Sequence, residues 1–93
     1  SSNPVALDVA KAKYMLGICY LKLNDIQRAM GYFDQAKQND AWKYKAMLGL
    51  VRGYAMMKKE DKALPILVEV MLRSKDDDIK SEATDLFQKI SPF

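Results

Sequence analysis

Residues 12–36 read AKYMLGICYLKLNDIQRAMGYFDQA, and residues 46–70, which lie 34 positions further on, read AMLGLVRGYAMMKKEDKALPILVEV. Four sites carry the same residue in both stretches, namely Ala12 and Ala46, Leu16 and Leu50, Tyr20 and Tyr54, and Ala29 and Ala63. Recurrence at a fixed spacing of this size is typical of stacked helical hairpins, in which one unit cannot bury its apolar face alone. The repeat favours a surface that holds a partner over a site that performs chemistry.

The composition excludes several classes of protein. The chain has 93 residues, of which 49% are hydrophobic and 29% charged, as in one small globular domain or a piece of a longer protein. It has one Cys and no His, so the usual ligands of zinc and the Cys-His or Ser-His couples of hydrolases are missing. We expect no enzyme activity, no catalytic residue, no metal and no cofactor.

The charge and hydropathy patterns bear on partners and location. The net charge is +3, and 15 Lys and Arg are mixed with 12 Asp and Glu, which argues against nucleic acid as the partner. No apolar run approaches the roughly 18 residues that a membrane span needs, and residues 1–93 do not open with a charged stretch followed by an apolar one, which is the pattern of a signal peptide. We expect a soluble protein without a transmembrane segment, and both the cytoplasm and the bacterial periplasm are compatible with it.

Apolar residues spaced by three and four predict five helices in a single domain that includes residues 1–93. Hairpin 1 takes in residues 5–40, hairpin 2 takes in 41–74, and a fifth helix covers 78–90. Within the hairpins, the predicted helices are 5–23, one that begins at 26, 41–58 and 62–73.

Short polar residues mark the helix starts. We expect Asn24-Asp25 to cap the second helix, Asn39-Asp40 the third and Asp61 the fourth, because their side chains can accept free backbone N–H groups. Pro65 would then fall close to the first turn of the fourth helix, where it costs little. The acids of residues 76–78 favour a helix N-terminus directly after them.

The fifth helix has two descriptions that the sequence leaves open. Its narrow apolar stripe and polar outer side are typical of a helix that caps the end of a stack. It can also be the first helix of a third unit, with Ala83 and Phe87 at the sites of Ala12 and Leu16. Both descriptions place the same helix in the same position.

The recurring residues are predicted to be mostly packing. Gly17, Ala29 and Ala63 are small, which allows two helix axes to approach, while Phe33 and Leu67 fill the space between hairpins, as do Tyr20 and Tyr54. The apolar residues of the first helix form a row on one face, and they include Val5, Val9, Ala12, Leu16, Cys19, Tyr20 and Leu23. We expect the Cys19 thiol to be buried and unreactive, and Trp42 to pack over a helix end.

These residues resemble the tetratricopeptide repeat (TPR), a 34-residue helix–turn–helix unit. In the first copy the matching residues are Leu16-Gly17, Tyr20, Ala29, Phe33 and Ala36. In the second copy Leu50, Tyr54 and Ala63 match, while Val51, Leu67 and Val70 replace the glycine, the aromatic residue and the second alanine. The resemblance covers residues 10–74. It implies an all-α, right-handed stack of two antiparallel helical hairpins plus a capping helix.

In repeats of this type the first helix of each hairpin lines a concave groove, so the resemblance implies binding residues on those helices. They are Lys11, Tyr14, Ile18, Leu21 and Lys22 in the first hairpin, and Lys45, Leu48, Arg52 and Met56 in the second. This mixed apolar and basic strip suits a protein or peptide partner that offers apolar anchors and carboxylates.

Two functions follow as expectations. The first is a non-enzymatic protein-protein interaction module that binds a peptide or partner segment in its groove. The second is a structural segment that forms a homo-oligomer or docks within a larger helical-repeat protein.

Overall fold

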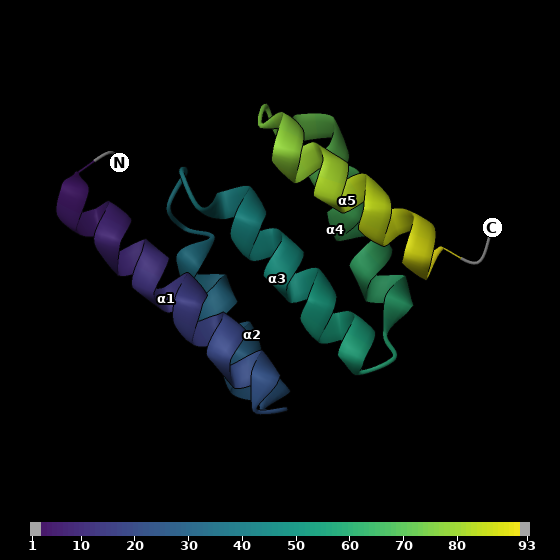
Figure 1. Ribbon diagram of the computed structural model, residues 1–93, viewed down its shortest axis with the longest axis horizontal. Coiled ribbons are helices and arrows are strands. Elements are labelled where there is room, and N and C mark those ends of the chain that lie inside the picture. The colour runs from purple at the N-terminus through teal and green to yellow at the C-terminus, as the bar shows by residue number, and fades with distance from the viewer. Residues whose placement is uncertain (1–2, 92–93) are drawn as a thin grey trace.

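The computed structural model describes residues 3–91, and within this range the chain is all-α and contains no strand (Figure 1). Its helices are α1 (Pro4–Lys22), α2 (Ile26–Ala36), α3 (Lys43–Met56), α4 (Glu60–Arg73) and α5 (Asp77–Ile90). The predicted fold class, a stack of antiparallel helical hairpins, is confirmed. None of the helices in the described range is both long and apolar enough to cross a membrane.

Two of the predicted helix caps are present. The Asp25 carboxylate accepts the backbone N–H of Arg28 at 3.3 Å at the start of α2. The Asp76 carboxylate accepts the N–H of Asp78 at 2.9 Å and that of Ile79 at 3.2 Å, and so caps α5. In both places a short acidic side chain satisfies N–H groups that have no partner within the helix.

The caps predicted for α3 and α4 are wrong. The N-cap residue of α3 is Trp42, which gives no side-chain cap, and the Asn39 side chain instead accepts the N–H of Ala41 within the preceding turn. Helix α4 begins at Glu60, so Asp61 lies inside its first turn. Pro65 therefore lies in the interior of α4, further from the helix start than predicted, where its ring removes one backbone hydrogen bond.

The repeat extends to the backbone of the turns. Asn24 and Lys58, which are 34 residues apart, both have φ of 61°, in the left-handed region. The amide one residue further on donates to the carbonyl of Tyr20 (2.9 Å) or of Tyr54 (2.8 Å). This is the hydrogen bond of a Schellman motif, which ends α1 and α3 in the same way and turns the chain back into α2 and α4.

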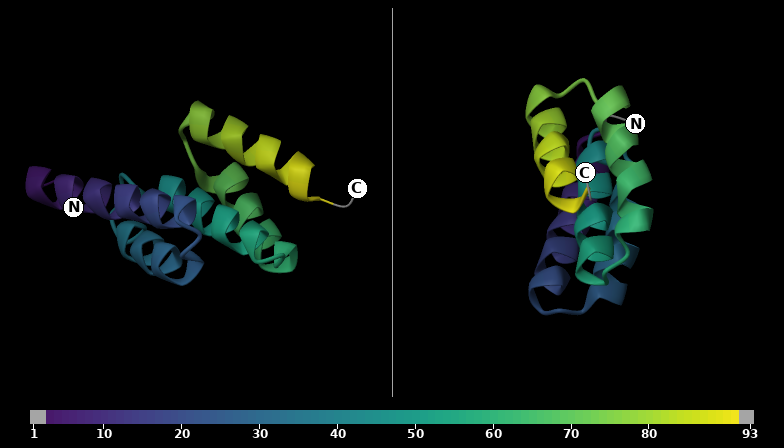
Figure 2. Two further views of the ribbon diagram at one scale, coloured as in Figure 1. Left: turned by 60° about the horizontal axis from the view of Figure 1, so that its bottom comes forward. Right: turned by 90° about the vertical axis from the view of Figure 1, so that its right-hand side faces the viewer.

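The helices form two layers. Helices α1, α3 and α5 lie side by side, and α2 and α4 lie behind them (Figures 1 and 2). Helix α2 packs in the angle between α1 and α3, and α4 packs between α3 and α5. Helix α5 therefore stands to α3 and α4 as α3 stands to α1 and α2, which is the position of a third first helix as well as of a cap.

Phe33 on α2 is the centre of the core of the first hairpin. It is fully buried, and its ring lies against Gly17 on α1 and Gly49 on α3. A Cβ atom on either glycine would lie 2.5 Å from Cε1 of the ring. The missing side chains of these two glycines therefore form the space that Phe33 occupies, so the predicted role of Gly17 in close helix approach is confirmed.

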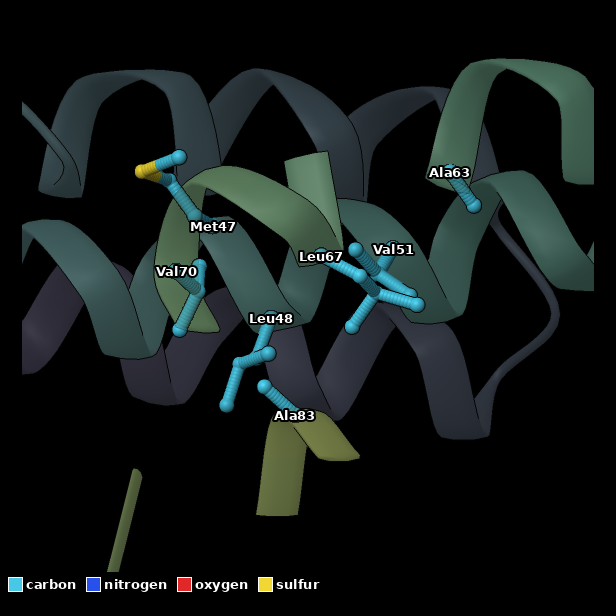
Figure 3. Packing of buried hydrophobic residues seen from close by; sticks show 7 residues of the cluster. All are labelled: Met47, Leu48, Val51, Ala63, Leu67, Val70 and Ala83. Carbon is cyan, nitrogen blue, oxygen red and sulfur yellow. The ribbon is translucent and has the colours of Figure 1, made fainter. Parts of the chain in front are cut away.

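A second core lies between α3, α4 and α5 (Figure 3). In it Leu48 points toward Ala83 of α5, and Val51 lies beside Leu67 of α4. All four side chains are buried, as is Ala63. The two cores share α3, which has seven buried residues, and this sharing joins the two hairpins into one stack.

Apart from Tyr20, which is half-buried and packs against the first core, the apolar row on α1 does not face the core. The buried residues of α1 are Ala10, Gly17 and Leu21, on the side that meets α2. Leu16 is 41% exposed and Leu23 73% exposed on the other side. Cys19 is exposed as well, so the prediction that its thiol is buried is wrong. Periodicity located the row correctly, but no described helix covers it.

Candidate functional site

The predicted groove residues all lie on α1 and α3, but they differ in access. Lys11, Lys22, Lys45, Arg52 and Met56 are exposed. Tyr14 and Ile18 are half-buried.

The structure changes the predicted role of two groove residues, Leu48 and Leu21. Leu48 is only 2% exposed because α5 lies over it, so it belongs to the core and is removed from the candidate site. Leu21 is 9% exposed and packs in the core with Phe33, although its side chain also forms part of a surface hollow.

A hollow of about 380 Å³ opens between α1, α3 and α5. Its walls are mostly apolar and are formed by Leu21, Val51, Ala55, Met56, Leu86 and Ile90, with Arg52 and Lys89 as the charged members. Met56 is 43% exposed. An apolar hollow with two cationic side chains can receive an apolar side chain of a partner and hold a carboxylate beside it.

Arg52 is already paired in this structure. Its Nη2 atom lies 2.6 Å from Oε2 of Glu82 on α5, and both side chains are a little over 40% exposed. At this exposure such a pair contributes at most about 1 kcal/mol. The ion pair orients Arg52 across the groove, and a carboxylate on a partner would have to share its guanidinium with Glu82.

An aromatic cluster with one cation lies where α1 meets the start of α3. The Tyr14 ring lies 5.2 Å from the Trp42 ring and 5.7 Å from the Phe33 ring, centroid to centroid. The Lys45 ammonium lies 5.9 Å from the Tyr14 centroid and 5.7 Å from that of Trp42. Trp42 thus packs against Tyr14 where α3 begins. Lys45 remains exposed above both rings, and it shares a hollow with Asp76, Asp78 and Glu82.

Tyr14 has a perturbed phenol because of its place between the helices. Burial raises the pKa of Tyr14 above its ordinary value, and the Glu82 carboxylate raises it further, while the Arg52 guanidinium opposes both. The phenol therefore stays protonated at neutral pH and can donate a hydrogen bond.

Lys89, Leu86 and Ile90 line the hollow and were not among the predicted groove residues. They lie on α5, which the sequence describes as a cap with a polar outer side or as the first helix of a third unit. These residues could have been found from the alternative alignment, in which α5 is the first helix of a third unit. It adds 71 to the residue number and places Lys89 at the site that Ile18 and Arg52 hold in the first two units.

Residues 3–91 contain no group of three or more His, Cys, Asp or Glu side chains that could hold a metal ion. Comparisons with models of known protein families, with curated proteins and with solved structures found no match to this chain.

Proposed function

We propose that this chain is a non-enzymatic protein-interaction module of the tetratricopeptide type, which binds a peptide or partner segment along the groove of α1, α3 and α5. The observation that carries the proposal is the apolar hollow with Arg52 and Lys89 among its lining residues. The tetratricopeptide assignment is supported by the 34-residue pattern and by the matching left-handed turns at Asn24 and Lys58.

The chemistry of the groove indicates the chemistry of the partner. Lys11, Lys22, Lys45 and Lys89 are all exposed, and Glu82 is engaged with Arg52. A segment with carboxylates beside a large apolar residue fits both features, since the apolar residue enters the hollow and the carboxylates meet the lysines. A preformed groove on packed helices also limits the entropy that binding costs.

A library of random peptides displayed on phage tests this proposal. We expect selection on the wild-type protein to enrich acidic peptides that contain large apolar residues. Binding of the selected peptides, measured by fluorescence polarisation, should weaken about tenfold in Lys89→Glu, because an attractive charge becomes a repulsive one.

The matched control is Lys62→Glu, which makes the same change in charge at an exposed position of α4, outside the hollow. It should leave the affinity close to that of the wild type. If selection enriches no such peptides, or if the two variants lose affinity equally, the groove is not the binding site.

A further inference from the structure

We propose that two copies of this chain pair through the exposed apolar row of α1, with the two helices antiparallel. The row is defined by Val5, Val9, Ala12, Leu16, Cys19 and Leu23 and is called the α1 row below. It lies on the side of α1 opposite its buried residues, and apart from Lys22, which borders both surfaces, it is separate from the groove proposed for peptides.

The α1 row is the main exposed apolar surface in the described part of the chain. Eight large hydrophobic side chains in residues 3–91 are exposed, and four of them belong to the α1 row, namely Val5 at 69%, Val9 at 46%, Leu16 at 41% and Leu23 at 73%. A contiguous apolar surface of this kind marks an interaction site.

The α1 row is not shaped to receive a helix like α2. The equivalent face of α3 receives α2 because Gly49 and Gly53 leave room for Phe33 and Met30. The sites 34 residues earlier are Met15 and Cys19, whose side chains fill that room. The contact that α2 makes with α3 is thus disfavoured at α1. A flatter contact between the α1 helices of two copies fits better.

The spacing of the α1 row is the same read from either end. Successive members are four, three, four, three and four residues apart, so an antiparallel second copy places Leu23 of the partner opposite Val5 and Leu16 of the partner opposite Ala12. Alternating steps of three and four form the seam of a two-helix coiled coil. In a two-fold dimer both copies use the same surface and make the same contacts, and the spacing of the α1 row allows this.

Charge complementarity favours the same register. Asp8 and Lys22 lie on one edge of the α1 row, 14 residues apart, and both are exposed. Neither forms an ion pair within residues 3–91. Antiparallel pairing brings Asp8 beside Lys22 of the partner, and the two-fold axis forms this pair twice.

The other edge of the row carries one unfavourable contact. Lys13 lies there, and the two-fold axis brings it near Lys13 of the partner. Its side chain is half-buried beside a hollow that Asp40 also lines, so this one contact opposes the pairing. Two helices alone bury less than the roughly 1,600 Å² of a standard interface, so we expect a dissociation constant in the micromolar range.

Sedimentation equilibrium over a range of concentrations tests the pairing. The wild type should approach twice the chain mass of 10.6 kDa at high concentration. Leu16→Glu should remain monomeric, since it places two carboxylates in the seam. Leu72→Glu on α4, where the native side chain is 78% exposed, is the matched control and should still dimerise. A wild type that stays monomeric at millimolar concentration overturns the proposal.

A charge exchange tests the register. Asp8→Lys and Lys22→Asp should each weaken dimerisation about tenfold or more, and the double variant should recover most of the loss. Within one chain these residues are about 21 Å apart along the helix, so the recovery can arise only between copies. Failure of the double variant to recover overturns the antiparallel register.

Cysteine cross-linking gives an independent check. Val9→Cys places a thiol opposite Cys19 of the partner, so mild oxidation should produce a covalent dimer. Wild-type Cys19 lies far from Cys19 of the partner in this register and should not cross-link. Cross-linking of the wild type in place of the variant would mean parallel pairing and would overturn the proposal.

Discussion

Phe33 joins three helices because two glycines face it. Its ring fills space that would otherwise hold the side chains of residues 17 and 49, on α1 and α3. Gly31, on the same helix as Phe33, has nothing within 4 Å of the position its Cβ would take. Gly17 and Gly49 are therefore needed for packing, whereas Gly31 is not, although all three lie in helices.

Gly49→Ala should destabilise the protein by about 1–3 kcal/mol, because the methyl group overlaps a rigid buried ring. Gly31→Ala should stabilise it by up to about 1 kcal/mol, since alanine is the better helix former and meets no neighbour. Urea unfolding followed by circular dichroism measures both.

Phe33→Leu in the Gly49→Ala background serves as the check on the mechanism. The double variant should lose less stability than the sum of the single variants, because the smaller side chain removes the overlap. Equal stability of Gly49→Ala and Gly31→Ala would show that Phe33 does not fill the site.

At the scale of elements, α5 makes the groove different from the one predicted from α1 and α3 alone. It covers Leu48, pairs Glu82 with Arg52 and adds Lys89 to the hollow. It also completes the surroundings of Tyr14, where the Glu82 carboxylate and burial act in the same direction. The state of Tyr14 thus reports whether α1, α3 and α5 are assembled.

The raised pKa of Tyr14 predicts a loss of stability at alkaline pH. Unfolded tyrosine ionises near pH 10, and the folded phenol ionises only above that value. The unfolded state therefore loses its proton first, so the contribution of Tyr14 to stability is complete below about pH 10 and is lost as the pH rises through the folded pKa. Ultraviolet difference titration of wild type against Tyr14→Phe measures the shift.

Glu82→Gln should lower the pKa of Tyr14, because it removes the carboxylate and leaves Arg52 unpaired. The pKa should still exceed the ordinary value, since burial is the larger cause. Glu69→Gln on α4 is the control and should leave the titration unchanged. An unchanged titration in Glu82→Gln would mean that α5 does not pack beside Tyr14.

At the scale of the whole molecule, stability should follow the order of packing. Helix α3 contacts every other helix, whereas α2 and α4 do not contact each other. Helix α3 has seven buried residues and α5 has one, Ala83. In a stack where each element packs mainly on its neighbours, the ends open before the middle.

Hydrogen exchange followed by mass spectrometry should therefore find the slowest amides in α3 and faster exchange in α5. Raising the protein concentration should slow exchange in α1 if copies pair there, and should leave α5 unchanged. Exchange of α5 as slow as that of α3 would contradict the stacked order, and would indicate one cooperative unit.

Much of the fold was predictable because helix periodicity and turn chemistry are local. Asp25 and Asp76 cap helices where polar residues precede apolar rows, and the helices agree with the predicted ranges to within about two residues at most ends. The start of α4 was not predictable in this way, and the cap predicted at Asp61 is wrong. Helix α4 begins earlier than its apolar pattern, at Glu60, in a turn that the left-handed Lys58 sets.

The sequence by itself determined which residues share a helix face and that two similar hairpins follow each other. Only the tertiary structure decided which faces are covered: Leu48 lies under α5, whereas Leu16 and Cys19 lie on a face that no described helix covers. The physical reason is that periodicity is a property of one helix, while burial depends on a second helix lying over that face. The spacing of apolar residues can therefore be found from the sequence, whereas the helix that covers them is known only from the packed structure.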